Sequence, residues 1–155
     1  MNKKLRIRSQ KAVLNFLSNI PCINVGGCGI STLAIYRWLE KKNRLKNPKI
    51  VYLYRHSEKK HFESNQKHQG STNQNFLKLL SVPNHVCLFN NGKYFDNNGT
   101  ILLDDYKYIQ HIDVETENGL QYLIDTIKAP ADTWNSWFDR AEIPKIAERL
   151  NVKLF

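Results

Sequence analysis

The sequence has few cysteines, no long apolar run and no secretory signal. It holds three cysteines, an odd number without the spacing of a disulfide framework, which favours free thiols in a reducing compartment. No apolar run approaches the length needed to cross a bilayer. The basic N-terminal stretch lacks an uninterrupted apolar core and a small-residue cleavage site, so no secretory signal is expected. We therefore expect a cytoplasmic protein without a membrane partner.

Acidic residues are scarce over the first two thirds of the chain. The 155 residues carry 23 Lys and Arg against 14 Asp and Glu, a net charge of +9, and residues 1–96 hold 17 of the cations but only 4 of the acids. This basic part suggests an acidic partner, either an acidic protein or a nucleic acid, and the alternative is that the cations lie on solvated helix faces and loops. Nucleic acid is possible but not favoured, because an RNP-like motif, zinc-finger spacing and an Arg-rich tract are all absent.

Length and composition indicate a single domain over residues 1–155. With 41% apolar residues, the chain can bury a core without disulfides or metals. Apolar periodicity, caps and turn residues predict helices over 9–19, 28–42, 73–81, 117–128 and 142–150, strands over 49–55 and 108–114, and a hairpin between these strands. This order predicts an α+β fold with an antiparallel sheet, a core over about 9–114 and a C-terminal helical region over 115–155.

Cys28 stands at the start of the strongest predicted helix. Gly26 and Gly27 precede it and Gly29 follows it, which lets another backbone or a substrate approach closely. The N-terminus of a helix offers unpaired N–H groups and a partial positive charge, and both favour a thiolate. Cys28 is therefore a candidate nucleophile. The alternative is a buried structural cysteine in a glycine-rich turn.

The segment HVCLFNNGKYFD supplies a candidate base and a group to orient it. Asn91-Gly92 is a strong signal for a two-residue hairpin turn. The resulting register places His85 and Asp96 on one face of the hairpin, as diagonal neighbours within reach of each other. A thiolate nucleophile needs such a base and orienting group.

The same register predicts how the hairpin packs. Leu88 is expected opposite Phe95, with both side chains facing away from the site into packed core. Phe89 is expected opposite Tyr94, on the face of the site and against the helix that Cys28 begins.

GGCGISTLAIYRWL and HVCLFNNGKYFDNNG together resemble the papain-like cysteine enzymes in their compact, transglutaminase-like form. In that superfamily a Cys begins a helix, a His begins a strand and an Asp or Asn lies on the next strand, in that order. The resemblance covers residues 22–99 and implies a nucleophile helix packed on a small antiparallel sheet. It makes Cys28 the nucleophile, His85 the base and Asp96 the orienting group. Where papain-type enzymes place an oxyanion-hole Gln, the candidate here is Asn24, beside the backbone N–H of Cys28.

The resemblance implies a cysteine-dependent hydrolase or acyl-transfer enzyme that forms a thioester with a protein, peptide or other amide and needs no cofactor or metal. Hydrolysis would make it a peptidase or amidase, and an amine acceptor would make it transglutaminase-like. The alternative is a non-enzymatic binding module whose basic surface holds nucleic acid or an acidic protein. The glycine-rich turn also faintly resembles a dinucleotide-binding turn, although the next strand ends on Arg55 rather than on an acidic residue.

The remaining motifs have structural interpretations. Three histidines of a polar loop lack the spacing of a metal site and are expected to be solvated: His56, His61 and His68. Two cysteines are expected to be small, buried apolar residues: Cys22 and Cys87. A group of C-terminal aromatic residues at helical spacing is expected in the core: Trp134, Trp137 and Phe138.

Overall fold

The elements follow the predicted order. The computed structural model describes residues 7–24, 26–54, 85–106, 108–128 and 137–155. Their helices and strands, in chain order, are α1 (Gln10–Ser18), α2 (Cys28–Lys41), β1 (Lys49–Tyr54), β2 (His85–Asn90), β3 (Lys93–Asp96), β4 (Gly99–Thr100), β5 (Tyr108–Asp113), α5 (Gly119–Lys128) and α6 (Glu142–Leu150). The expected polar loop over 56–73, its three histidines and the expected helix over 73–81 lie outside the described residues.

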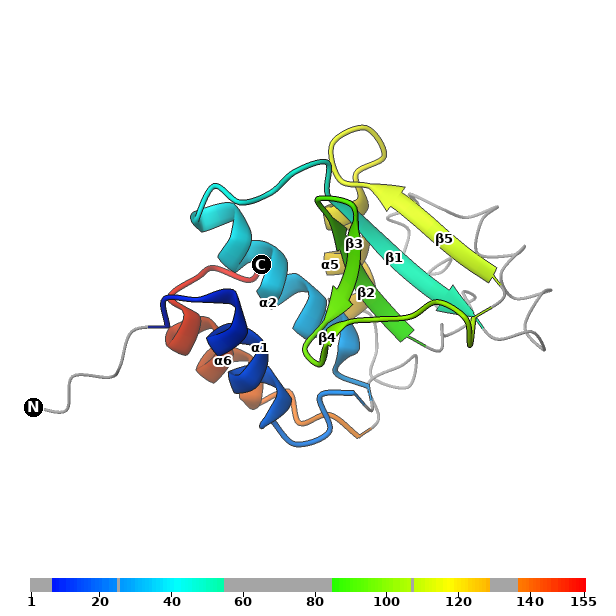
Figure 1. The fold of residues 1–155 in the computed structure, drawn as a ribbon. Helices are drawn as coiled ribbons and strands as arrows, with labels where there is room; N and C mark the ends of the chain where they lie inside the picture. Colours follow the sequence, from blue (N-terminus) through cyan, green and yellow to red (C-terminus); the bar gives the residue numbers. More distant parts are fainter. Residues whose placement is uncertain (1–6, 25, 55–84, 107, 129–136) are drawn as a thin grey trace, which may run out of the picture.

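The strands form one antiparallel sheet in the order β4-β3-β2-β1-β5 (Figure 1). All four helices among the described residues contribute to one large core with residues from a single face of this sheet. The α+β class with an antiparallel sheet is thus confirmed. None of the helices that the structure describes has both the length and the apolar character needed to cross a membrane.

Helix α2 lies at the centre of the molecule. Eleven of its fourteen residues are buried, as in a helix covered on nearly every side. It packs against β2, β3, α1, α5 and α6. Because the rest of the fold surrounds this helix, the position of its first residue, Cys28, is fixed by packing rather than by a loop.

The β2–β3 hairpin has the predicted register. Leu88 pairs with Phe95 and Phe89 with Tyr94. The turn residues Asn91 and Gly92 have φ values of +51° and +78°, as the two-residue turn requires. Leu88 and Phe95 belong to the core that contains α2, so this part of the expected packing is confirmed.

The expected position of Phe89 and Tyr94 against the Cys28 helix is wrong. Their rings lie 4.8 Å apart, centroid to centroid, in a second cluster with Val51 and Cys87 on the opposite face of the sheet. The reason is the pleat: neighbouring residues of β2 alternate between faces, and α2 covers the face of Leu88. The interpretation of Cys87 as a buried apolar residue is confirmed, because none of its surface is exposed.

The C-terminal aromatic residues separate. Phe138 is buried as expected, whereas Trp137 is 73% exposed and the expectation that it lies in the core is wrong. Trp137 lies in a bend between α5 and α6, where helical spacing does not apply. Trp134 lies outside the described residues.

Candidate active site

Cys28 is the first residue of α2 and follows Gly27, which forms no side-chain cap for the helix. A Cβ atom on Gly27 would lie 2.7 Å from the carbonyl oxygen of Ile23 and 2.7 Å from Cδ2 of Phe138. Only glycine fits between these neighbours, so close packing fixes the chain immediately before Cys28. Cys28 as a whole residue is 8% exposed.

His85 and Asp96 form the predicted pair. Nε2 of His85 lies 2.7 Å from Oδ2 of Asp96, and their side chains are only 12% and 8% exposed. The other carboxylate oxygen of Asp96, Oδ1, accepts a hydrogen bond from the backbone N–H of Asn98 at 2.7 Å. Both oxygens of Asp96 are thus engaged, which fixes the carboxylate and the plane of the imidazole that it contacts.

The Cys28 thiol interacts with the same imidazole. Burial lowers the pKa of His85, but hydrogen bonds to Asp96 and Cys28 and the charges of both groups outweigh burial and raise the pKa to about 9. Because Nε2 faces Asp96, Nδ1 is the ring nitrogen left to exchange a proton with the thiol. The structure therefore brings His85 and Asp96 into direct contact, and Cys28 lies near enough to raise the pKa of the imidazole.

Their meeting point is the end of the hairpin away from its turn. His85 is the first residue of β2 and Asp96 is the last of β3, so both lie at the same end of the sheet. Side chains alternate between the two faces along a strand, and Leu88 and Phe95 face α2. The side chains of His85 and Asp96 therefore start from the opposite face of the sheet. At a strand end, an imidazole can still reach the helix N-terminus where Cys28 lies.

Three further hydrogen bonds lie next to this arrangement, and their residues were not predicted as functional. Buried Asn97, next to Asp96, donates from Nδ2 to the Ser18 hydroxyl at 3.2 Å and accepts the Ser31 hydroxyl at Oδ1 at 3.5 Å. The hydroxyl of Thr32 donates to the carbonyl oxygen of Val86 at 3.1 Å. The sequence signal is the pair of polar residues, Ser31 and Thr32, within the apolar first half of the helix.

Asn24 lies beside the candidate pair. It is exposed and lines a cavity of about 450 Å³ together with seven other residues: His85, Asp96, Asn98, Ile101, Leu102, Asp105 and Tyr106. Its role in an oxyanion hole stays a prediction. Cys22 is exposed, so its expected burial is wrong: it lies in the surface turn after Pro21, with φ at +58°.

That turn also removes the support for a dinucleotide site. Such a site needs a strand before its glycines, but residues 21–24 form a turn. Among the residues that the structure describes, no three His, Cys, Asp or Glu side chains gather so as to hold a metal ion.

Comparison of the chain with protein-family models, with curated proteins and with solved structures finds no match. The chemistry must therefore be argued from the geometry. A thiol at a helix N-terminus, an imidazole whose pKa that thiol raises and a carboxylate on Nε2 of the ring are the parts needed for nucleophilic attack on a carbonyl carbon.

Proposed function

We propose that the protein is a cysteine-dependent hydrolase or acyl-transfer enzyme that acts through a thioester at Cys28. The observation that carries the proposal is the His85–Asp96 contact of 2.7 Å on an imidazole that also interacts with Cys28. A part-buried histidine that is bonded to a carboxylate and lies near a thiol at a helix N-terminus supports a catalytic role, because apolar residues would pack there at lower cost.

In the proposed reaction, the Cys28 sulfur attacks the carbonyl carbon of the substrate and forms a C–S bond. His85 takes the thiol proton and gives it to the leaving amine as the C–N bond breaks. In the second step water, or an amine in a transfer reaction, loses its proton to His85 and attacks the thioester carbon. The C–S bond then breaks and the thiol is restored. Asp96 stabilises the imidazolium and holds the ring in place.

The papain-like, transglutaminase-like core is part of this proposal. Cys28 begins a helix, His85 begins a strand and Asp96 ends the next strand, in that chain order, and the helix packs on an antiparallel sheet. We propose a protein, peptide or other amide as the substrate, because the cavity beside His85 offers both apolar and polar side chains. The free thiols support a place in a reducing compartment such as the cytoplasm.

Alkylation by iodoacetamide tests the nucleophile. Cys22 is exposed, whereas Cys28 and Cys87 are buried, so exposure alone predicts that Cys22 is labelled first. An activated Cys28 reverses that order near neutral pH, and the His85→Ala variant should restore it. Peptide mapping by mass spectrometry measures the three rates in one sample. If Cys28 is labelled no faster than Cys22, the thiol is not activated.

Turnover is tested with p-nitrophenyl acetate, whose attack by a thiolate releases p-nitrophenolate and leaves an acetyl thioester. We expect a burst of about one p-nitrophenolate per chain, with the acetyl group on Cys28 in the intact-mass and peptide spectra. Cys28→Ala should remove the burst, and Cys22→Ala is the matched control that should keep it. Added hydroxylamine should cleave the acetyl group from Cys28 as the hydroxamate, which identifies the bond as a thioester. Absence of a burst in the wild type would favour the non-enzymatic binding module.

A further inference from the structure

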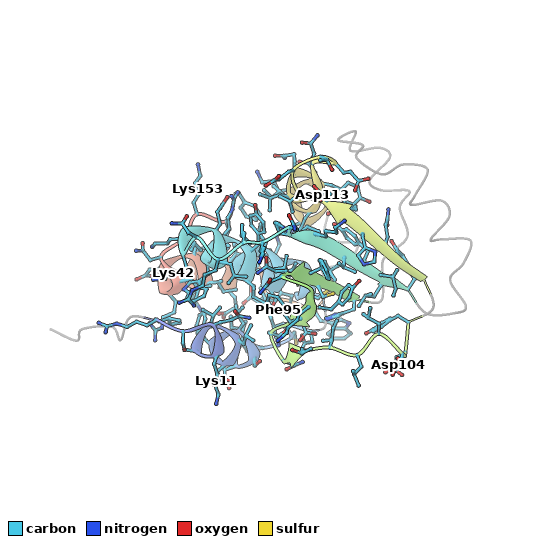
Figure 2. The ribbon with its side chains drawn as sticks, turned by 45° about the horizontal axis from the view of Figure 1, so that its top comes forward. Lys11, Lys42, Phe95, Asp104, Asp113 and Lys153 are labelled. Atoms are coloured by element: carbon cyan, nitrogen blue, oxygen red, sulfur yellow. The ribbon has the colours of Figure 1, made fainter. Side chains whose placement is uncertain are left out.

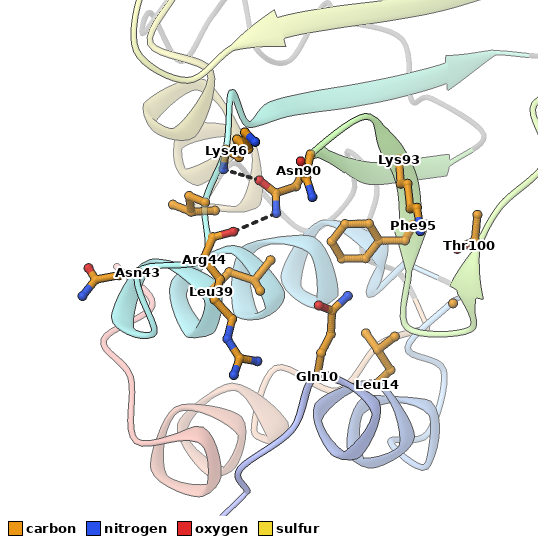
Figure 3. Close-up of a pocket in the computed structure, with 13 residues that line it drawn as sticks. Gln10, Leu14, Leu39, Asn43, Arg44, Lys46, Asn90, Lys93, Phe95 and Thr100 are labelled. Atoms are coloured by element: carbon orange, nitrogen blue, oxygen red, sulfur yellow. Dashed lines mark hydrogen bonds between the residues drawn. The ribbon is translucent and has the colours of Figure 1, made fainter.

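A second concave site lies at the turn end of the hairpin, away from His85. It is a groove of about 610 Å³ between α1, the loop after α2 and strands β2 to β4 (Figure 3). Gln10 and Leu14 reach into it from α1, and Arg44 extends from the loop on the other side (Figure 3). Its volume falls within the range of known ligand sites.

The groove carries charge of one sign. Arg44, Lys46 and Lys93 line it, and none of the lining residues that the structure describes is acidic. Its apolar surface comes from residues of three elements and the loop: Leu14, Leu39, Leu45 and Phe95. Phe95 is only 6% exposed, so the groove offers no open aromatic face on which a base could stack.

The basic loop is held in place before any ligand binds. The side chain of Asn90, which is buried, accepts the backbone N–H of Lys46 at 2.7 Å and donates to the carbonyl oxygen of Arg44 at 3.1 Å. The backbone N–H of Asn91 donates to the carbonyl oxygen of Lys46 at 3.0 Å. The guanidinium of Arg44 also lies 5.5 Å from the centre of the Trp38 ring. Binding therefore costs little ordering of this loop.

We infer that this groove binds an acidic peptide segment of a partner protein, in which carboxylates alternate with apolar side chains. The carboxylates would pair with Arg44 and Lys93, and the apolar side chains would cover the part-exposed Leu14 and Leu45. A single-stranded nucleic acid fits less well, because proteins that bind single strands offer aromatic surfaces on which the bases stack. The chain's own N-terminal segment is a poor occupant, since residues 1–6 include three cations and no acid.

The charged residues elsewhere on the surface allow a matched control. Lys153, near the C-terminus, and Lys93 are both exposed lysines, so their reversal changes the net charge by the same amount. Figure 2 shows Lys153 extending away from the body of the molecule, on the helical side. Lys153 does not line the groove.

The test is fluorescence anisotropy with a fluorescein-labelled peptide made of Glu-Glu-Leu repeats. We expect saturable binding to the wild type, about tenfold weaker binding to Lys93→Glu and binding within about twofold of the wild type for Lys153→Glu. The milder variant Lys93→Gln should lose roughly threefold. A Lys-Lys-Leu peptide should not bind. Circular dichroism checks that each variant is folded.

Three outcomes would overturn the inference. One is equal weakening by Lys93→Glu and Lys153→Glu, which would mean that only net charge matters. Another is the absence of saturable binding by the peptide. The last is tighter binding of a single-stranded thymidine oligonucleotide than of the peptide, with loss of that binding in Lys93→Glu. This result would assign the groove to nucleic acid. None of these outcomes bears on Cys28, so the catalytic proposal stands or falls separately.

Discussion

The hydroxyl of Thr32 donates a hydrogen bond to the carbonyl oxygen of Val86 at 3.1 Å, and this contact joins the helix that Cys28 begins to the strand that His85 begins. Both partners are buried. The contact lies within one turn of helix from the candidate nucleophile and one residue from the candidate base. We expect this contact to help align the two reacting side chains.

Replacing Thr32 with Val keeps the volume and removes the donor. We expect a loss of about 1 kcal/mol in the free energy of unfolding, and a several-fold fall in the rate of the p-nitrophenyl acetate burst. Thr32→Ser should restore both, because it returns the hydroxyl. Urea unfolding and burst kinetics on the same preparations measure the two effects. A burst rate unchanged in Thr32→Val would mean that the contact only stabilises the fold.

The pH dependence should have an alkaline limb set by His85. The protonated imidazole supplies the proton for the leaving group, and the pKa of His85 is raised to about 9. Activity should therefore be retained through neutral pH and fall as pH rises through about 9. An NMR titration of the imidazole should give the same value, and Cys28→Ser should lower it because the thiol's contribution is removed. A titration midpoint near the ordinary value of about 6.5 would mean that His85 is not held in its protonated form at neutral pH.

Replacing Asp96 should reduce activity less than replacing Cys28. The two contacts of its carboxylate predict how large the loss is for each variant. The carboxylate accepts from His85 through one oxygen and from the Asn98 N–H through the other, but an amide has only one oxygen. Asp96→Asn keeps one of the two contacts and should lose about tenfold to a hundredfold in activity, whereas Asp96→Ala should lose about a thousandfold. Both should shift the alkaline limb to lower pH. An Asp96→Ala variant with wild-type activity would exclude Asp96 as the orienting group.

Two glycines beside Cys28 form a matched pair for a packing test. Alanine at Gly27 would place its Cβ 2.7 Å from a backbone oxygen, whereas at Gly29 the nearest atom, of Ile127, is 3.4 Å away. We expect Gly27→Ala to cost about 1–3 kcal/mol of stability and to slow alkylation of Cys28. Gly29→Ala should be neutral or stabilise by up to about 1 kcal/mol. Thermal unfolding together with iodoacetamide rates distinguishes the two variants. Equal effects would show that the chain at Gly27 has room to shift.

The hairpin could be predicted because its register depends on local chemistry. Asn91-Gly92 fixes the turn, and the turn fixes which residues share a face. The position of Phe89 and Tyr94 could not be predicted in this way. Which face of the sheet receives the helices depends on contacts between distant segments, and the alternation of side chains is the same for either choice.

The errors at Cys22 and Trp137 have a related cause. Both residues lie in irregular segments, where neither helical nor strand periodicity determines exposure. Asn97 could not be predicted as a positioning residue because its partners, Ser18 and Ser31, are 79 and 66 residues away in the sequence. The His85–Asp96 pair was predictable because only eleven residues and one turn separate its members.

Strand β2 begins at the candidate site, with His85, and ends at the groove, with Asn90. Six residues of extended chain span roughly 17 Å, and a strand in the middle of a sheet does not stretch or bend easily. The strand thus keeps the distance between the two sites constant. A substrate that uses both must place its acidic anchor at least five or six extended residues from the bond that reacts, and a shorter peptide can reach only one of them.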